Sequence, residues 1–217
     1  MFNHMHFHII TLFPKAFDSY LGESILKRAI EDKKLKVSFY NPRDYVVNKW
    51  KRVDRAPYGG GPGLVIEAEP VAKAIDAAVK KAKGKAKIIF LSPSGKGFSN
   101  EYASKTAKKF KHLIIICGRY EGIDARVKKI FKVEEISVGP FVLTGGELPA
   151  MLMIDVIARQ VPGILGNIDS LEERRISSSE VYTRPEVLKY KGKNYRVPKV
   201  LLSGHAGKIE EWKKSRK

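Results

Sequence analysis

The run Leu113-Ile114-Ile115-Ile116-Cys117-Gly118 is apolar throughout and stops at a glycine. A fully apolar run of this length is typical of a strand that is buried on both faces, as in a parallel sheet. Further strands are expected at residues 6–12, 37–40, 88–91 and 133–138, each of which ends near a proline or glycine. The pattern predicts one mostly parallel sheet.

Helical periodicity fills the intervals between these strands. Apolar residues recur at every fourth position between residues 17 and 30, and Pro70 opens a second amphipathic stretch. Ser99 is placed to cap a helix that runs to Lys109, and residues 147–161 form one more. Alternating strands and helices predict an α/β domain.

Two segments lack such periodicity. Residues 41–64 contain Pro57-Tyr58-Gly59-Gly60-Gly61-Pro62-Gly63, which predicts a loop. After Gly166 the composition shifts to charged and small residues. We therefore expect an α/β domain at residues 1–166, a linker at 167–181, and a small basic helical domain at 182–217 that closes with a helix around Ile209 and Trp212.

The net charge of +18 and the pI near 9.9 favour a polyanionic partner, with nucleic acid first. The alternative is a solvated basic surface with no such partner. Cys117 is the only cysteine, so the chain can form neither an internal disulfide nor a zinc site built from several thiolates. Apolar runs are too short to span a membrane, and the first residues do not resemble a signal peptide, which predicts a cytoplasmic protein.

Three expected strands are followed by turns rich in glycine or proline, at residues 92–95, 118–122 and 139–146. Ligands of parallel α/β sheets bind beyond the carboxyl ends of the strands, so the three turns predict one shared pocket. Any one of them alone would be only a turn. None matches a Walker loop or a dinucleotide-binding fingerprint.

His4, His6 and His8 would lie on one face of the first strand and could in principle bind a metal. No carboxylate or thiolate partner is near them in the sequence. We therefore interpret them as terminal or edge histidines and expect no metal site.

Several motifs together resemble the bacterial tRNA (guanine-37-N(1))-methyltransferase family, a branch of the SPOUT superfamily. They run in order from about Phe7 to Trp212. The motifs are Ser24-Ile25-Leu26-Lys27-Arg28-Ala29, the loop at 57–63, Cys117-Gly118-Arg119-Tyr120-Glu121-Gly122-Ile123-Asp124, Leu143-Thr144-Gly145-Gly146-Glu147-Leu148-Pro149-Ala150-Met151, Val161-Pro162-Gly163-Ile164-Leu165-Gly166, Tyr182-Thr183-Arg184-Pro185-Glu186-Val187 and Val200-Leu201-Leu202-Ser203-Gly204.

The resemblance implies an α/β domain threaded into a trefoil knot, and a homodimer with active sites at its interface. It implies methyl transfer from S-adenosylmethionine to N(1) of guanine 37 in tRNA, with magnesium as a further expectation. No periodicity argument would propose a knot, because knots are rare.

The resemblance also implies a donor site made largely from backbone groups. Glycines allow close approach to the donor, and apolar neighbours bury its ring. The matching positions are Pro93, Gly118, Tyr120, Val138, Gly139, Pro140, Phe141, Val142, Leu143, Gly145 and Gly146. Pro140 stands where the family usually has an acidic residue.

For catalysis, the resemblance implies a role for Arg159 and for Glu121, an acidic residue near the donor. The family's linker aspartate, the proton acceptor, aligns with Arg174 when counted from Gly166 and with Asp169 when counted back from Tyr182. Asp169 is the preferred base, followed by Glu173 and Glu172; all three could instead be solvated linker charges.

Tyr58, Gly59 and Gly60 are expected to contact the target guanine, or else to form only an ordered surface loop. The chain ends soon after Trp212, so its C-terminal domain is short for the family. Lysines near Lys80, near Lys105 and in the tail could compensate through phosphate contacts. The substituted linker motivates one alternative: a tRNA-binding SPOUT protein with lost or altered catalysis.

Overall fold

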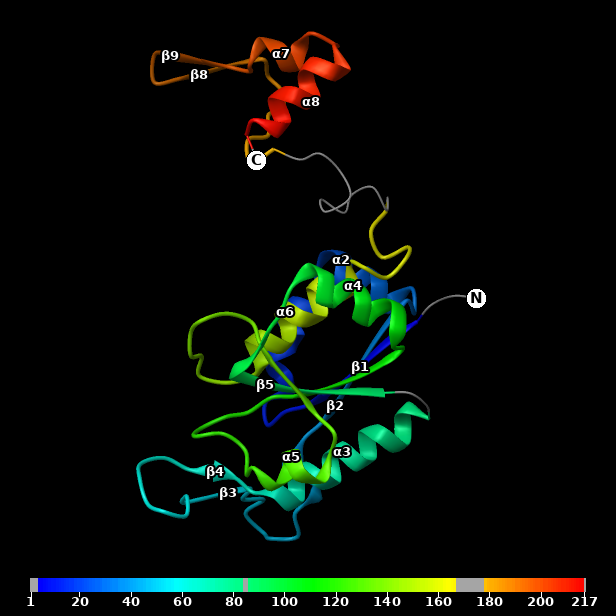
Figure 1. Cartoon of the computed structure of the whole chain (residues 1–217), viewed down its shortest axis with the longest axis vertical. Coiled ribbons are helices and arrows are strands. Elements are labelled where there is room, and N and C mark those ends of the chain that lie inside the picture. The colour runs from blue at the N-terminus through cyan, green and yellow to red at the C-terminus, as the bar shows by residue number, and fades with distance from the viewer. Residues whose placement is uncertain (1–3, 84–85, 167–177, 217) are drawn as a thin grey trace. The chain divides into compact units, whose positions relative to one another are not determined.

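A computed structural model describes residues 4–83, 86–166 and 178–216 (Figure 1). The chain divides into two compact units, Met1–Leu165 and Gly166–Lys217. Most of the expected linker, residues 167–177, lies outside the described residues.

The first unit is built on a five-stranded sheet in which every neighbouring pair is parallel. The spatial order is β2 (Leu35–Tyr40), β1 (Met5–Ile10), β6 (His112–Ile116), β5 (Ala86–Gly97) and β7 (Glu134–Ser137). The predicted parallel α/β fold is confirmed. The trefoil knot stays a prediction.

One face of the sheet is covered by α2 (Ser24–Glu31), α4 (Asn100–Lys109) and α6 (Glu147–Ala158), as Figure 1 shows, and α1 (Asp18–Leu21) packs on the same core through Leu21. The core beneath them contains Phe7, Ile115, Met153 and Ile157, all fully buried. As expected, Ser99 caps α4, where its hydroxyl accepts a hydrogen bond from the Tyr102 amide.

The helix expected over residues 17–30 is not continuous. A 3₁₀ turn, η1 (Pro14–Phe17), precedes α1, and Gly22 separates α1 from α2. Ser24 begins α2 with a positive φ of 51°. Apolar residues keep their spacing of four positions across the break, so the periodic pattern did not reveal it.

The opposite face carries α3 (Ala68–Ala82) and α5 (Arg126–Ile130), which pack on a second core around Ile75, Ile114 and Val127. The five-residue α5 was not predicted, because it is too short to give a periodic signal.

The segment expected to be a loop contains a turn, η2 (Pro42–Tyr45), and a short antiparallel pair, β3 (Asp54–Arg55) with β4 (Val65–Ile66). Residues 57–63 lie between these two strands. The loop predicted at residues 57–63 is therefore confirmed, and residues 46–53 likewise lie outside any helix or strand.

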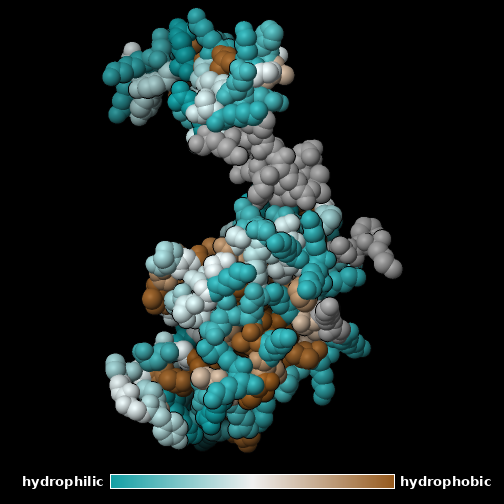
Figure 2. All heavy atoms as spheres, viewed as in Figure 1, coloured by the Kyte–Doolittle hydropathy of each residue, from teal (hydrophilic) through white to brown (hydrophobic). Residues whose placement is uncertain are grey.

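The second unit contains α7 (Lys199–Leu202) and α8 (Ala206–Lys214), and also an antiparallel hairpin, β8 (Val187–Tyr190) with β9 (Lys193–Arg196). The purely helical expectation is thus corrected. Lys191 and Gly192 turn the hairpin with positive φ values of 48° and 73°, as a type I′ turn requires. On the face in Figure 2 this unit is mainly hydrophilic.

Across the described parts of the chain, every helix is too short or too polar to cross a bilayer.

Candidate active site

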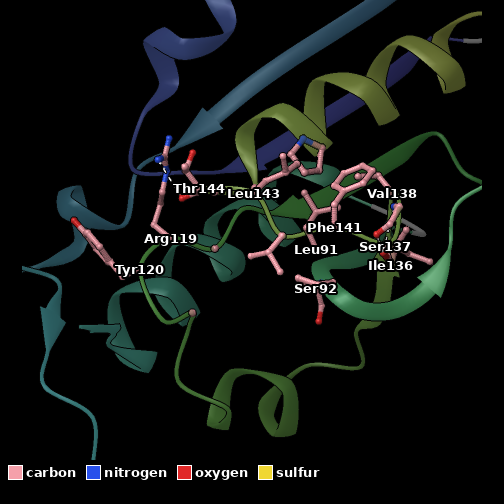
Figure 3. Close-up of a pocket in the computed structure, with 18 of the residues that line it drawn as sticks. Leu91, Ser92, Arg119, Tyr120, Ile136, Ser137, Val138, Phe141, Leu143 and Thr144 are labelled. Atoms are coloured by element: carbon pink, nitrogen blue, oxygen red, sulfur yellow. Dashed lines mark hydrogen bonds between the residues drawn. The ribbon is translucent and has the colours of Figure 1, made fainter. Parts of the chain in front are cut away.

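A cavity of about 300 Å³ opens beyond the carboxyl ends of β6 and β7 and beside the middle of β5, where the pairing with β7 shifts register between Leu91 and Lys96. Its walls come from residues 91–93, 118–122, 136–139, 141–146 and 149, which are far apart in the sequence (Figure 3). The three segments that the sequence analysis grouped together therefore do meet in one cavity, but residues 92–95 belong to β5 and not to a turn after it.

Ten of the eleven residues expected to bind the methyl donor line this cavity. They are Pro93, Gly118, Tyr120, Val138, Gly139, Phe141, Val142, Leu143, Gly145 and Gly146. The exception is Pro140, which is exposed and does not line it.

The closure of the cavity depends on a close approach at Gly146. Its amide donates to the Gly118 carbonyl at 2.9 Å, and Arg119 and Gly145 form an isolated antiparallel bridge. A Cβ at position 146 would lie 2.6 Å from the Cys117 Cα. Only glycine lets the start of α6 sit directly against the end of β6.

A partly buried ion pair lies beside this contact. The Arg119 Nε donates to the Glu147 carboxylate at 2.9 Å, and the Thr11 hydroxyl donates to its other oxygen at 2.8 Å. Glu147 is 3% exposed, in the first turn of α6, where the helix dipole favours a negative charge. The Arg119 guanidinium also lies 4.7 Å from the centre of the Phe13 ring.

Sequence reasoning assigned no role to Arg119, Glu147 or Thr11. Both Arg119 and Glu147 stand in the quoted motifs, so their positions were marked. Their ion pair could not be predicted from the sequence, because 28 residues separate them and local sequence patterns do not report contacts between distant turns.

The cavity wall is mainly apolar. Figure 3 shows Leu91, Val138, Phe141 and Leu143 around the same space. The Ser137 hydroxyl donates to the Gly139 carbonyl at 2.9 Å and so fixes the turn after β7. Apolar side chains beside the backbone groups of glycine turns suit a flat ring that carries polar edges.

Cys117 lies directly behind the cavity and is buried. Burial, followed by the nearby Glu147 carboxylate, raises the pKa of its thiol. The thiol therefore stays protonated at neutral pH and is no nucleophile.

Glu121 lines the cavity with an exposed side chain, and its amide donates to the Leu64 carbonyl at 3.0 Å. A Cβ at Gly63 would collide with the Glu121 side chain, so the end of the glycine-rich loop adjoins the cavity. Tyr58 is fully exposed, and neither it nor Gly59 and Gly60 lines the cavity.

Arg159 is half-buried at the C-terminal cap of α6, whereas the cavity lies at the start of that helix. At 1.5 Å per residue, roughly 20 Å separates Arg159 from Gly146. A single chain therefore does not bring Arg159 to the cavity. Asp169, Glu172, Glu173 and Arg174 lie outside the described residues.

The sequence and the fold of this chain also match known proteins. The sequence pattern of the tRNA (Guanine-1)-methyltransferase TrmD family matches residues 5–217. The chain belongs to this family.

Relatives of similar length support that membership. The tRNA (guanine-N(1)-)-methyltransferase of Desulforamulus reducens is 43% identical over 215 residues, which cover 97% of this chain and 83% of the relative. That of Geobacter sulfurreducens is 44% identical over 216 residues, which cover 98% and 86%. The crystal structure of the tRNA (m1G37) methyltransferase from Aquifex aeolicus matches with a TM-score of 0.79 and 38% identity, over 97% of this chain and 88% of that one.

Proposed function

We propose that this chain transfers the methyl group of S-adenosylmethionine to N(1) of guanine 37 in tRNA, with the donor in the cavity beside β5 and beyond β6 and β7. Membership of the family supports the reaction, and the cavity supplies the place for it. The observation that carries the proposal is the convergence of the three segments at one cavity.

In this proposal the adenine ring lies against Leu91, Val138 and Leu143, and backbone groups of Gly118 and Gly145 bind its polar edge and the ribose. The volume of about 300 Å³ falls in the range of small-molecule sites. The Arg119–Glu147 pair holds two of these turns together and positions their backbone, and Arg119 itself lines the cavity.

The reaction needs a base and a cation. The proton leaves guanine N(1) for a carboxylate, N(1) forms a bond with the methyl carbon, and the bond from that carbon to sulfur breaks to release S-adenosylhomocysteine. Negative charge that develops on the guanine O6 is stabilised by a guanidinium. Arg159 is the proposed cation, and Asp169 is the proposed base, ahead of Glu173.

Arg159 reaches a cavity most simply in a homodimer, from the partner chain. The outer face of α6 supports such an interface: Leu148 and Leu152, one turn apart, are 58% and 40% exposed. Tyr20 of α1 lies beside this face and is also exposed. Partial burial and the nearby Asp155 carboxylate raise the pKa of its hydroxyl. Exposed apolar side chains grouped in this way are typical of protein interfaces.

A mixing experiment tests the shared site. Arg159→Ala should lose about 10²–10³-fold in kcat while it still binds the donor. Gly118→Leu should lose donor binding, because a side chain at this position has open space around its Cβ and would fill the cavity. When the two inactive variants are refolded together, mixed dimers should recover activity. No recovery, with dimers present, would mean that Arg159 serves its own chain.

The linker base is tested by Asp169→Asn and Glu173→Gln in parallel. Loss of about 10²–10⁴-fold in kcat in only the first variant would support Asp169. Loss in only the second would transfer the role to Glu173.

The second unit is proposed to contact tRNA. Residues 178–216 carry ten Lys and Arg side chains against four Glu, which favours binding to phosphates. Tyr58 and its glycine loop are proposed to contact the guanine after it leaves the anticodon stack, because the end of this loop adjoins Glu121 at the cavity.

A magnesium requirement remains a proposal. Glu121 is the acidic residue among those lining the cavity, and magnesium commonly binds through one or two carboxylates together with substrate oxygens. Activity measured during titration of magnesium into chelator-treated protein tests it. The cytoplasmic location, likewise a prediction, is tested by cell fractionation.

The deciding assay is mass spectrometry of tRNA after incubation with the protein and isotope-labelled donor. Label on N(1) of guanine 37 is the expected result. Label on a ribose hydroxyl would refute the proposal. Binding of donor and tRNA without turnover would support the non-catalytic alternative, which the comparisons do not favour.

A further inference from the structure

Three histidines meet on the face of the sheet that α3 covers. His6 and His8 lie on β1, and His112 begins the adjacent strand β6, paired in register with His6. One ring nitrogen from each of the three lies within 4.8 Å of the others, and the His8 Nε2 and His112 Nδ1 are 3.0 Å apart. Neutral imidazole is the commonest protein ligand of transition metals.

The remaining ring nitrogens of the two buried histidines already have partners on β2. The His6 Nε2 lies 2.9 Å from the Ser38 hydroxyl, and the His8 Nδ1 lies 2.9 Å from the Tyr40 hydroxyl. Metal-binding histidines usually hydrogen bond in this way through the nitrogen that does not bind the metal, which fixes the ring orientation. These contacts fix the orientation of the two rings, whose centres lie 3.8 Å apart in a tilted stack.

Two of the three rings are shielded from solvent by the sheet and by α3. His8 is fully buried and His6 is 8% exposed, whereas His112 is partly buried. The three rings therefore occupy a position between the strands and the solvent that a single small cation could reach.

We propose that His6, His8 and His112 bind one divalent transition-metal cation, with zinc as the best fit, and that the cation fastens β1 to β6. Three nitrogens and one water would complete a tetrahedral shell. Nitrogens on such a shell lie about 3.3 Å apart. The ring nitrogens lie within 4.8 Å of one another, so binding would replace the hydrogen bond between His8 and His112 and would open the tilted stack of His6 on His8. Each ring keeps one proton, which faces Ser38, Tyr40 or solvent.

This site is separate from the methyl-donor cavity. His6 and His112 stand near the amino ends of their strands, whereas the cavity opens beyond the carboxyl ends. His112 is only partly buried, which gives a cation a route in. Lys36, Lys81 and Lys111 are close enough to lower the histidine pKa values. They weaken binding of a cation, but all three are exposed and screened by solvent and salt.

The sequence analysis expected no metal site because it considered only His4, His6 and His8. His112 is 104 residues from His8, and only the pairing of β1 with β6 brings the two together. The same pairing leaves His4 out: it is exposed, and its ring contacts the Lys33 carbonyl.

The test uses the full-length protein without an affinity tag, first treated with a chelator. Zinc is titrated in competition with a chromophoric chelator, and cobalt is titrated as a spectroscopic probe. We expect one zinc per chain, an intense visible cobalt spectrum typical of tetrahedral coordination, and a melting temperature higher by about 5–10 °C when zinc exceeds its Kd a hundredfold.

Matched variants separate the site from other histidines. His112→Gln should weaken zinc binding at least tenfold and abolish the cobalt spectrum. His4→Ala and His205→Ala should change neither. Tyr40→Phe removes only a hydrogen-bond partner and should weaken zinc binding about 10–100-fold.

Two outcomes would overturn the proposal. One is wild-type protein that binds no zinc at micromolar concentration or gives the weak cobalt spectrum of octahedral coordination. The other is binding that His112→Gln leaves unchanged. The wild-type cobalt spectrum remains decisive even if His112→Gln fails to fold.

Discussion

The Arg119 guanidinium and the Glu147 carboxylate form an ion pair of 2.9 Å that ties the turn after β6 to the first turn of α6. The side chain of Glu147 is 4% exposed and that of Arg119 is 26% exposed, so solvent screens the pair only weakly. Arg119 itself lines the cavity, and Gly145 and Gly146 line it just before Glu147. The pair therefore connects the stability of the fold with the shape of the candidate donor site.

Removing one partner of this ion pair should lower the stability of the folded protein. Glu147→Ala leaves Arg119 and the Thr11 hydroxyl without their acceptor, and should lower the free energy of unfolding by about 2–3 kcal/mol. The Kd for S-adenosylmethionine should rise as the turns loosen. Urea denaturation and calorimetry measure the two effects. Glu101→Gln, which removes the exposed pair with Lys105, should change neither; similar losses in both variants would contradict this role for Glu147.

Gly146→Ala should destabilise the protein by about 1–3 kcal/mol, because the new methyl group would press on the Cys117 backbone. Thermal unfolding and donor binding measure the change. Gly97→Ala is the matched control, since a Cβ there has open space around it. Adding Cys117→Ala to Gly146→Ala should not restore stability, because the closest atom is the Cα of residue 117; a full rescue would disprove this explanation.

Cys117 should resist alkylation in the folded protein. Burial raises the pKa of its thiol, so the reactive thiolate is scarce at pH 8, and the side chain is out of reach of solvent. Mass spectrometry after iodoacetamide treatment should find the native chain unmodified and the urea-unfolded chain modified once. An exposed cysteine introduced by Gly97→Cys should react in the folded state. Rapid labelling of native Cys117 would mean that the contact with Gly146 opens frequently.

The affinity for tRNA should fall with salt, and the second unit should carry part of that dependence. Lys208, Lys213 and Lys214 lie on α8. Replacing one of them with Glu should lower the magnitude of the slope of log K against log salt concentration by about one for each phosphate contact that is lost. Filter binding at several salt concentrations measures the slope. Lys80→Glu on α3 tests whether the first unit also contributes to this salt dependence. Unchanged slopes in all of these variants would remove the lysines from the tRNA contact.

Much of the fold could be read from local patterns. A buried parallel strand needs an apolar run such as Leu113 to Ile116. A helix start needs a cap such as Ser99. Both features depend only on residues that are neighbours in the sequence, so both can be predicted from it. The sequence analysis did not predict the short α5 or the charged β8–β9 hairpin, because neither is long enough to show a periodic pattern of apolar residues.

The sequence by itself determined the fold class, the family and the turns that line the candidate site, because strand burial and glycine placement are local properties of the chain. Only the tertiary structure paired Arg119 with Glu147 and brought His112 to His6 and His8. It also placed Arg159 at the far end of α6 from the cavity. Such relationships join residues tens of positions apart, and they exist only once the sheet has set the order and register of its strands.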